Sequence, residues 1–323
     1  MKKAIIVISL IIIAVASAVA YQIITTEEKQ EIERIIITAS FYPLYEFARQ
    51  VGGEKVEVIN ITPAGTKPHG FEPTPKDLIA IQNSKLFIFN GAGLDPWAEK
   101  IAPELEEKGV VVIHMAKHFE LIEGEEKYKH DDYNDKYKDE YKKEVDGKRL
   151  DPHIWLDPII AKRQVEIIRD ALIKIDPINS SLYEENARQY LEKLSELDQK
   201  FQQGLAVCQI REAVASHAAF GYLAKRYNLT IFSIAGLSPK EEPSLRRLGE
   251  IAKLAQEKNI RYIFFETLVS PKLAETIAKE IGAQTLVFNP IEGLTEEEIK
   301  QGKNYISIME ENLKNLRRAL VCK

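Results

Sequence analysis

Three of the six histidines lie in turns or directly after strand-like segments. His69 lies in the turn-rich PAGTKPHGFEP, His153 lies between two Asp-Pro pairs in LDPHIWLDP, and His217 follows the strand-like EAVAS. Glu292 lies in NPIEGL, just after the strand-like TLVF. Neutral imidazoles suit a divalent ion such as zinc, and a carboxylate would complete a tetrahedral set of four ligands. These four side chains are therefore candidates for one metal site, although such widely spaced ligands match no motif by themselves.

The segments that carry these residues belong to an alternating pattern. Apolar strand-like runs such as RIIITAS and KLFIFN are followed by helical patterns, and the same alternation recurs in the second half of the chain. Such alternation predicts an α/β fold with two lobes, residues 34–179 and 207–323, each with a parallel sheet flanked by helices. Because ligands bind at the carboxyl ends of parallel strands, we expect the metal site between the lobes.

A long helical pattern without strands separates the two halves. In residues 180–206, apolar side chains recur at helical spacing, as in Tyr183, Ala187, Tyr190 and Leu194. A helix of this length would be a rod of about 35 Å. We expect one rigid helix to join the lobes and to limit domain closure.

The N-terminus and one internal segment differ in composition from the rest. Residues 1–20 combine two lysines, an apolar run and an A-x-A site, which predicts a cleaved signal peptide or a retained N-terminal anchor and an extracytoplasmic chain. Residues 21–33 read as a charged linker. The segment 123–149 is mostly charged and is interpreted as a solvated loop. The alternative is a lid or a transient metal-collecting loop that uses His130, Asp131 and Asp132.

Two cysteines and the overall charge narrow the class of protein. In an exported chain, Cys208 and Cys322 are expected to form a disulfide that ties the last helix to the start of the second half, the alternative being two free thiols. The net charge of -5 does not favour nucleic-acid binding. The sequence also lacks HExxH, GxSxG and Walker motifs, so we do not expect an enzyme.

Several segments in a fixed order resemble the zinc/manganese class (cluster A-I) of ABC-transporter solute-binding proteins. They include ASFYPLYEFA, PHGFEPTPKDL, NGAGLDPWAEK, DPHIWLDP, SHAAFGYLAKRY and NPIEGL. The resemblance implies two α/β lobes bridged by a rigid helix, with the metal buried between them. It places the histidine ligands at His69, His153 and His217 and the acidic ligand at Glu292. A histidine at position 217 favours zinc over manganese, whereas the family varies at the position of Glu292.

Two further carboxylates lie close to these ligands in the sequence. Glu266 ends the strand-like IRYIFFE and is either an alternative ligand or a hydrogen-bond partner of one. Asp157 either orients His153 or caps the following helix.

The resemblance implies an extracytoplasmic, monomeric binding protein that carries Zn²⁺ as its transported ligand to a membrane ABC permease with a cytoplasmic ATPase. The alternatives are manganese or iron(II) uptake, a zinc-dependent hydrolase, and a metal-binding adhesin.

Overall fold

The computed structural model describes residues 34–124, 149–240 and 242–323. The expected signal peptide or anchor at 1–20, the linker 21–33 and residues His130, Asp131 and Asp132 of the charged loop lie outside these ranges. Residues Ile35–Lys323 form one compact unit. No helix within the described residues is long and apolar enough to cross a membrane.

The first lobe contains a four-stranded parallel sheet. Its strands are β1 (Ile35–Ala39), β2 (Val56–Asn60), β3 (Leu86–Phe89) and β4 (Val111–His114), in the spatial order β2-β1-β3-β4. Side chains of β3 alternate between two apolar clusters. Leu86 and Ile88 join the larger cluster, and Phe87 and Phe89 join a smaller one. The sheet is therefore covered on both faces, as parallel sheets usually are.

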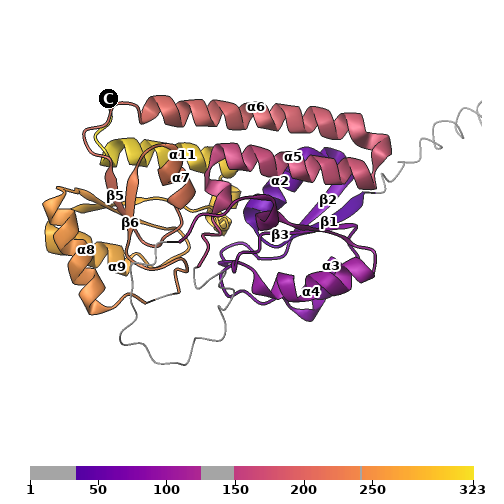
Figure 1. The fold of residues 1–323 in the computed structure, drawn as a ribbon, viewed down its shortest axis with the longest axis horizontal. Coiled ribbons are helices and arrows are strands. Elements are labelled where there is room, and N and C mark those ends of the chain that lie inside the picture. The colour runs from indigo at the N-terminus through magenta and orange to yellow at the C-terminus, as the bar shows by residue number, and fades with distance from the viewer. Residues whose placement is uncertain (1–33, 125–148, 241) are drawn as a thin grey trace, which may run out of the picture. The chain divides into compact units, whose positions relative to one another are not determined.

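Helices occupy both faces of this sheet (Figure 1). α2 (Tyr42–Gly52) and α5 (Pro158–Ile175) contribute to the larger cluster, whereas α3 (Pro75–Gln82) and α4 (Pro96–Glu107) contribute to the smaller one. Short 3₁₀ turns, η1 (Gly53–Lys55), η2 (Met115–His118), η4 (Ile154–Leu156) and η5 (Pro177–Asn179), complete the first half.

The second lobe repeats this architecture with another parallel sheet. Its strands are β5 (Glu212–Ala215), β6 (Thr230–Ser233), β7 (Tyr262–Phe265) and β8 (Gln284–Val287), in the order β6-β5-β7-β8. The helices are α7 (Gly221–Arg226), α8 (Leu245–Glu257), α9 (Lys272–Ile281), α10 (Glu296–Lys300) and α11 (Tyr305–Ala319). The predicted fold of two parallel-sheet lobes flanked by helices is confirmed.

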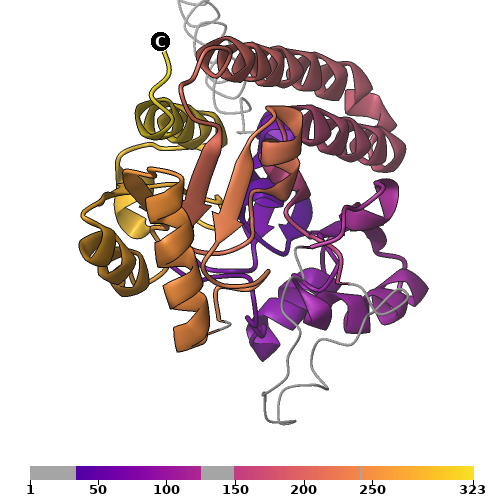
Figure 2. The same cartoon turned by 60° about the vertical axis from the view of Figure 1, so that its left-hand side comes forward.

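The long helix α6 (Ser180–Gly204) packs against helices of both lobes. It contacts α5 of the first lobe and α11 of the second, and both views show α5 and α6 side by side (Figures 1 and 2). Tyr183, Ala187, Tyr190, Leu194 and Phe201 are buried in the same apolar cluster as residues of both sheets. The lobes thus share one continuous core, which opposes their separation.

The predicted disulfide joins Cys208 to Cys322. It links the segment after α6 to the segment after α11, and these segments also pair through hydrogen bonds from Gln209 N–H to Leu320 O (3.1 Å) and from Lys323 N–H to Val207 O (3.0 Å). The C-terminus is therefore tied to the entrance of the second lobe.

Removing this bridge should destabilise the fold. The two cysteines are 114 residues apart in sequence, so the disulfide restricts a long loop of the unfolded chain. We expect the double variant Cys208→Ala/Cys322→Ala to lose about 2–4 kcal/mol of unfolding free energy in denaturant titrations. An unchanged unfolding midpoint would contradict this role.

Candidate metal centre

The structure brings together the four candidate ligands. One donor atom from each of His69, His153, His217 and Glu292 lies within 4.8 Å of every other, and all four residues are buried. Glu292 Oε1 is 3.4, 3.5 and 3.2 Å from the Nε2 atoms of His69, His153 and His217. The His153 Nε2 is 3.4 Å from that of His69 and 3.3 Å from that of His217.

These five spacings match edges of a zinc tetrahedron. Ligands bound tetrahedrally to zinc at about 2.0–2.1 Å lie about 3.3–3.4 Å from one another. The buried Glu292 Oε1 accepts no aligned hydrogen bond in spite of its three imidazole neighbours. The four donor atoms thus surround a common centre, where a divalent ion would contact all of them.

Loops at the carboxyl ends of parallel strands present three of these side chains. His69 follows β2, His217 follows β5 and Glu292 follows β8, which is the sheet edge expected for a ligand site in parallel α/β folds. His153 immediately precedes the 3₁₀ turn η4. The ligands therefore come from both lobes.

The loop that carries Glu292 is held in a strained conformation. Ile291 has a φ of 57°, which is unfavourable for a β-branched residue. Its N–H donates to Asn289 Oδ1 at 2.8 Å, and Asn289 is itself held by hydrogen bonds with Asn312, at 2.8 and 2.7 Å. This buried amide network stabilises the turn that directs Glu292 into the cluster.

Two of the imidazoles are oriented by carboxylates behind them. His153 Nδ1 lies 2.8 Å from Asp151 Oδ1, and His217 Nδ1 lies 2.5 Å from Glu266 Oε1. Each hydrogen bond places the proton on Nδ1 and leaves Nε2 free to bind a metal ion, as is common for metal-binding histidines. Of the two roles considered for Glu266, the geometry shows the hydrogen-bond partner.

Asp151 was not among the residues expected from the sequence. An Asp-Pro pair by itself predicts a turn and no contact of the aspartate side chain. Its carboxylate also accepts the backbone N–H of His153 at 2.9 Å. Gly221 leaves room for the Asp151 carboxylate. A Cβ at position 221 would lie 2.6 Å from Asp151 Oδ2, which is too close for two non-bonded atoms.

Asp157 instead caps a helix. Its Oδ1 accepts the N–H of Ile159 at 2.8 Å at the start of α5, and the same oxygen forms an ion pair with Arg226 of the second lobe.

Trp155 also contacts residues of both lobes. It packs on Phe41, with ring centroids 4.7 Å apart, while its Nε1–H donates to Pro290 O at 2.7 Å.

The histidines differ in their tendency to hold a proton. Burial lowers the pKa of His69 below its usual value. Burial acts in the same direction on His217, but the charge of Glu266, the hydrogen bond to it and the charge of Glu292 outweigh burial and raise the pKa of His217 to about 10. In the same way, the hydrogen bond to Asp151 and the nearby carboxylate of Glu292 outweigh burial and raise the pKa of His153. The three imidazoles hold the pKa of Glu292 well below its usual range, against the effect of burial.

The family is decided by a comparison with known protein families. Residues 37–319 match the model of zinc-uptake complex component A, periplasmic, named ZnuA. The chain belongs to the ZnuA family. The match spans both lobes and all four clustered residues of this ZnuA-family chain.

Individual relatives agree with this assignment. The chain is 38% identical over 291 residues to the high-affinity zinc uptake system protein ZnuA of Bacillus subtilis, covering 90% of this chain and 89% of that protein. It is 40% identical over 294 residues to the zinc-binding lipoprotein AdcA of Streptococcus pneumoniae, where the match covers 90% of this chain but only 57% of AdcA.

Solved structures show the same fold. The Zn(II)-bound ZnuA-like domain of Streptococcus pneumoniae AdcA has a TM-score of 0.74 at 38% identity, covering 89% of this chain and 99% of that one. The laminin-binding protein Lmb of Streptococcus agalactiae, described as having adhesin and metal transporting activity, has a TM-score of 0.75 at 29% identity, covering 89% of this chain and 100% of that one.

The carboxylate behind His153 should contribute to metal affinity. We expect Asp151→Asn to weaken zinc binding by about 10- to 100-fold, because the imidazole loses the charge that fixes its orientation and increases its basicity. Asp157→Asn is the matched control, since it changes a buried aspartate of the same segment that does not contact the cluster. Competitive titration with a zinc chelator measures both variants. Equal losses in the two variants would contradict a specific role for Asp151.

The metal-free protein should become less stable as the pH rises. The pKa of His217 is raised in the folded state from 6.5 to about 10, so its contribution to stability is complete below about pH 6.5 and is lost as the pH rises through about 10. The slope should approach about 1.4 kcal/mol per pH unit in this window. Unfolding titrations of metal-free protein test this, with Glu266→Gln expected to flatten the profile. An unfolding free energy of the metal-free wild type that does not change between about pH 6.5 and 10 would contradict this prediction.

Proposed function

We propose that this chain is an extracytoplasmic, monomeric binding protein that captures Zn²⁺ and delivers it to an ABC permease with a cytoplasmic ATPase. The observation that carries the proposal is the set of donor-atom spacings of 3.2–3.5 Å around one buried centre. Membership of the ZnuA family supports the proposed metal, and the printed names of relatives such as the Bacillus subtilis protein refer to zinc uptake.

Each of the four side chains has a distinct role in this proposal. His69, His153 and His217 bind the ion through Nε2, and Glu292 binds it through Oε1 and offsets one of its two charges. Asp151 and Glu266 act from behind the imidazoles and do not bind the ion. In this proposal the protein binds and releases the ion without catalysing a reaction, and so it serves as a carrier.

The geometry favours a carrier over a zinc hydrolase. Catalytic zinc sites usually have three protein ligands and an open position for water, with a base beside it. Here a fourth donor, Glu292 Oε1, lies within 3.5 Å of all three imidazole nitrogens. The other nearby carboxylate, Glu266, is occupied by hydrogen bonds from His217 and Ser216.

The donor set also favours zinc over manganese. Manganese prefers oxygen donors and higher coordination numbers, whereas three nitrogens and one oxygen suit zinc. Iron(II) lies between these ions in its affinity for such ligands and is disfavoured by the same closed tetrahedron.

A competition experiment tests both the metal and the ligands. The protein without its first 33 residues should bind one zinc ion and prefer zinc to manganese. His217→Ala should weaken zinc binding by more than the about 100-fold expected for loss of an outer hydrogen-bond partner. His118→Ala, at an exposed histidine outside the cluster, is the matched control and should bind zinc like wild type. Equal affinity for the two metals, or an indifferent His217→Ala, would refute the assignment.

A further inference from the structure

The indole of Trp155 joins the turns that carry two of the four clustered residues. Trp155 lies two residues after His153, and its Nε1–H donates to the carbonyl oxygen of Pro290 at 2.7 Å. Pro290 lies two residues before Glu292. Trp155 and Pro290 are both buried. One hydrogen bond thus links the turn of His153 to the loop of Glu292, across the boundary between the two halves of the fold.

Three further contacts hold Trp155 itself. Its ring lies beside the His153 imidazole, with ring centroids 5.2 Å apart, and Phe41 packs edge-on against it, with centroids 4.7 Å apart. The backbone carbonyl of Trp155 accepts the hydroxyl of Tyr305 at 2.6 Å. Because the ring, the indole N–H and the carbonyl are each held separately, the turn of His153 has little freedom to shift.

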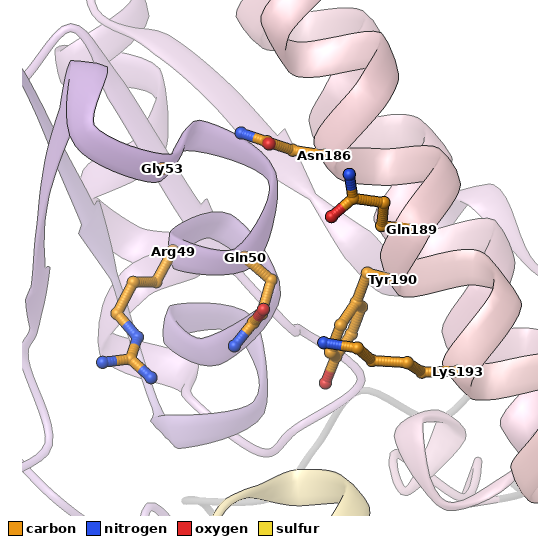
Figure 3. A pocket seen from close by; sticks show the side chains of 7 residues that line it. All are labelled: Arg49, Gln50, Gly53, Asn186, Gln189, Tyr190 and Lys193. Carbon is orange, nitrogen blue, oxygen red and sulfur yellow. The ribbon is translucent and has the colours of Figure 1, made fainter.

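The contact between Trp155 and Phe41 depends on a well-fastened part of the first lobe. Phe41 directly precedes α2, and Asn186 Nδ2 of α6 donates to Val51 O near the end of that helix at 3.0 Å. Figure 3 shows Asn186 extending from α6 toward the turn at Gly53 that follows α2. The helix that begins after Phe41 is therefore tied to α6, which packs against both lobes.

The loop of Glu292 is held by the first lobe on both of its sides. Pro290 accepts the indole N–H on one side, and Leu294 O accepts the N–H of Gly65 at 2.8 Å on the other. Gly65 lies in the loop that also carries His69. Glu292 thus belongs to the second lobe by sequence, but contacts with the first lobe fix the position of its loop.

These contacts set the separation of two donor atoms. Glu292 Oε1 lies 3.5 Å from His153 Nε2. A zinc tetrahedron has edges of about 3.3–3.4 Å. Manganese instead prefers octahedral sites rich in oxygen, so the donor atoms would have to move apart to admit further ligands. A hydrogen bond that fixes the distance between the two turns opposes this rearrangement.

We propose that Trp155 is a positioning residue that makes the site selective for zinc, because it fixes the separation of His153 and Glu292 without binding the ion. This inference rests on the proposed function and adds the residue that sets the size of the site. Loss of the indole N–H leaves the buried Pro290 carbonyl without this donor and allows the two turns to move apart. Zinc then binds more weakly, whereas manganese loses less.

The conservative variant Trp155→Phe tests this in competitive titrations with zinc and with manganese. We expect zinc affinity to fall about tenfold or more, as for loss of other groups that orient metal ligands, and manganese affinity to fall less. Trp97→Phe is the matched control, because it makes the same substitution at a buried tryptophan in the smaller apolar cluster of the first lobe. It should keep the wild-type preference for zinc. Equal losses for the two metals, no loss, or the same change in both variants would overturn the proposal.

The Tyr305→Phe variant tests the same position from the other side and replaces Trp155→Phe if that variant does not fold. It removes the hydroxyl that donates to Trp155 O and should weaken zinc binding about fivefold, with a smaller loss for manganese. In the double variant the losses should be less than additive, because both substitutions act through Trp155. An unchanged preference for zinc in Tyr305→Phe, or additive losses, would refute the role of Trp155.

Failure of this inference differs from failure of the proposed function. If the wild type binds one zinc ion and prefers it to manganese, and Trp155→Phe keeps that preference, only the role of Trp155 is refuted. If the wild type shows no preference for zinc, the proposed function and the role of Trp155 are both refuted.

Discussion

Four buried donor atoms, three imidazole nitrogens and one carboxylate oxygen, converge on one point. Glu292 Oε1 has three imidazole nitrogens within 3.5 Å but accepts no aligned hydrogen bond from them. Removing such groups from water is costly unless a counter-charge is present. The surrounding structure therefore has to hold these groups in a position that they would not adopt by themselves, and a cation at their centre offsets the cost.

The shared core of the two lobes supplies the necessary rigidity. Phe47 of α2 packs against Tyr305 of α11, with ring centroids 5.1 Å apart, and α6 packs on both sides of this junction. The segment around His153 is also fastened from the second lobe, because Tyr222 donates to Asp151 O at 2.9 Å and Tyr305 donates to Trp155 O at 2.6 Å. Ligands from different lobes are thus positioned by one continuous frame, and the metal does not have to draw the lobes together.

Strand-end geometry made the cluster a candidate from the sequence, and the resemblance to solute-binding proteins assigned its four residues, including His153. The ends of parallel strands gather at one edge, so residues such as His217 after β5 and Glu292 after β8 were expected to approach each other without any contact being known. Asp151 was missed because its role depends on the angle at which the turn returns its carboxylate to His153 Nδ1. The positive φ of Ile291 could not be predicted from the sequence either, because β-branched residues rarely adopt this conformation. The hydrogen bonds around Asn289, which depend on the tertiary fold, stabilise it.

Charge balance explains why two carboxylates stand behind the imidazoles. In the metal-free state, Asp151, Glu266 and Glu292 carry three negative charges, while the raised pKa values of His153 and His217 favour two positive ones. Exchange of those two protons for one Zn²⁺ leaves the same single negative charge in excess. Because burial penalises uncompensated charge, a site that is equally balanced in both states can be deeply buried and still load and unload its ion. The carboxylates of Asp151 and Glu266 therefore favour protonation of these imidazoles in the metal-free protein and would offset the charge of a bound ion.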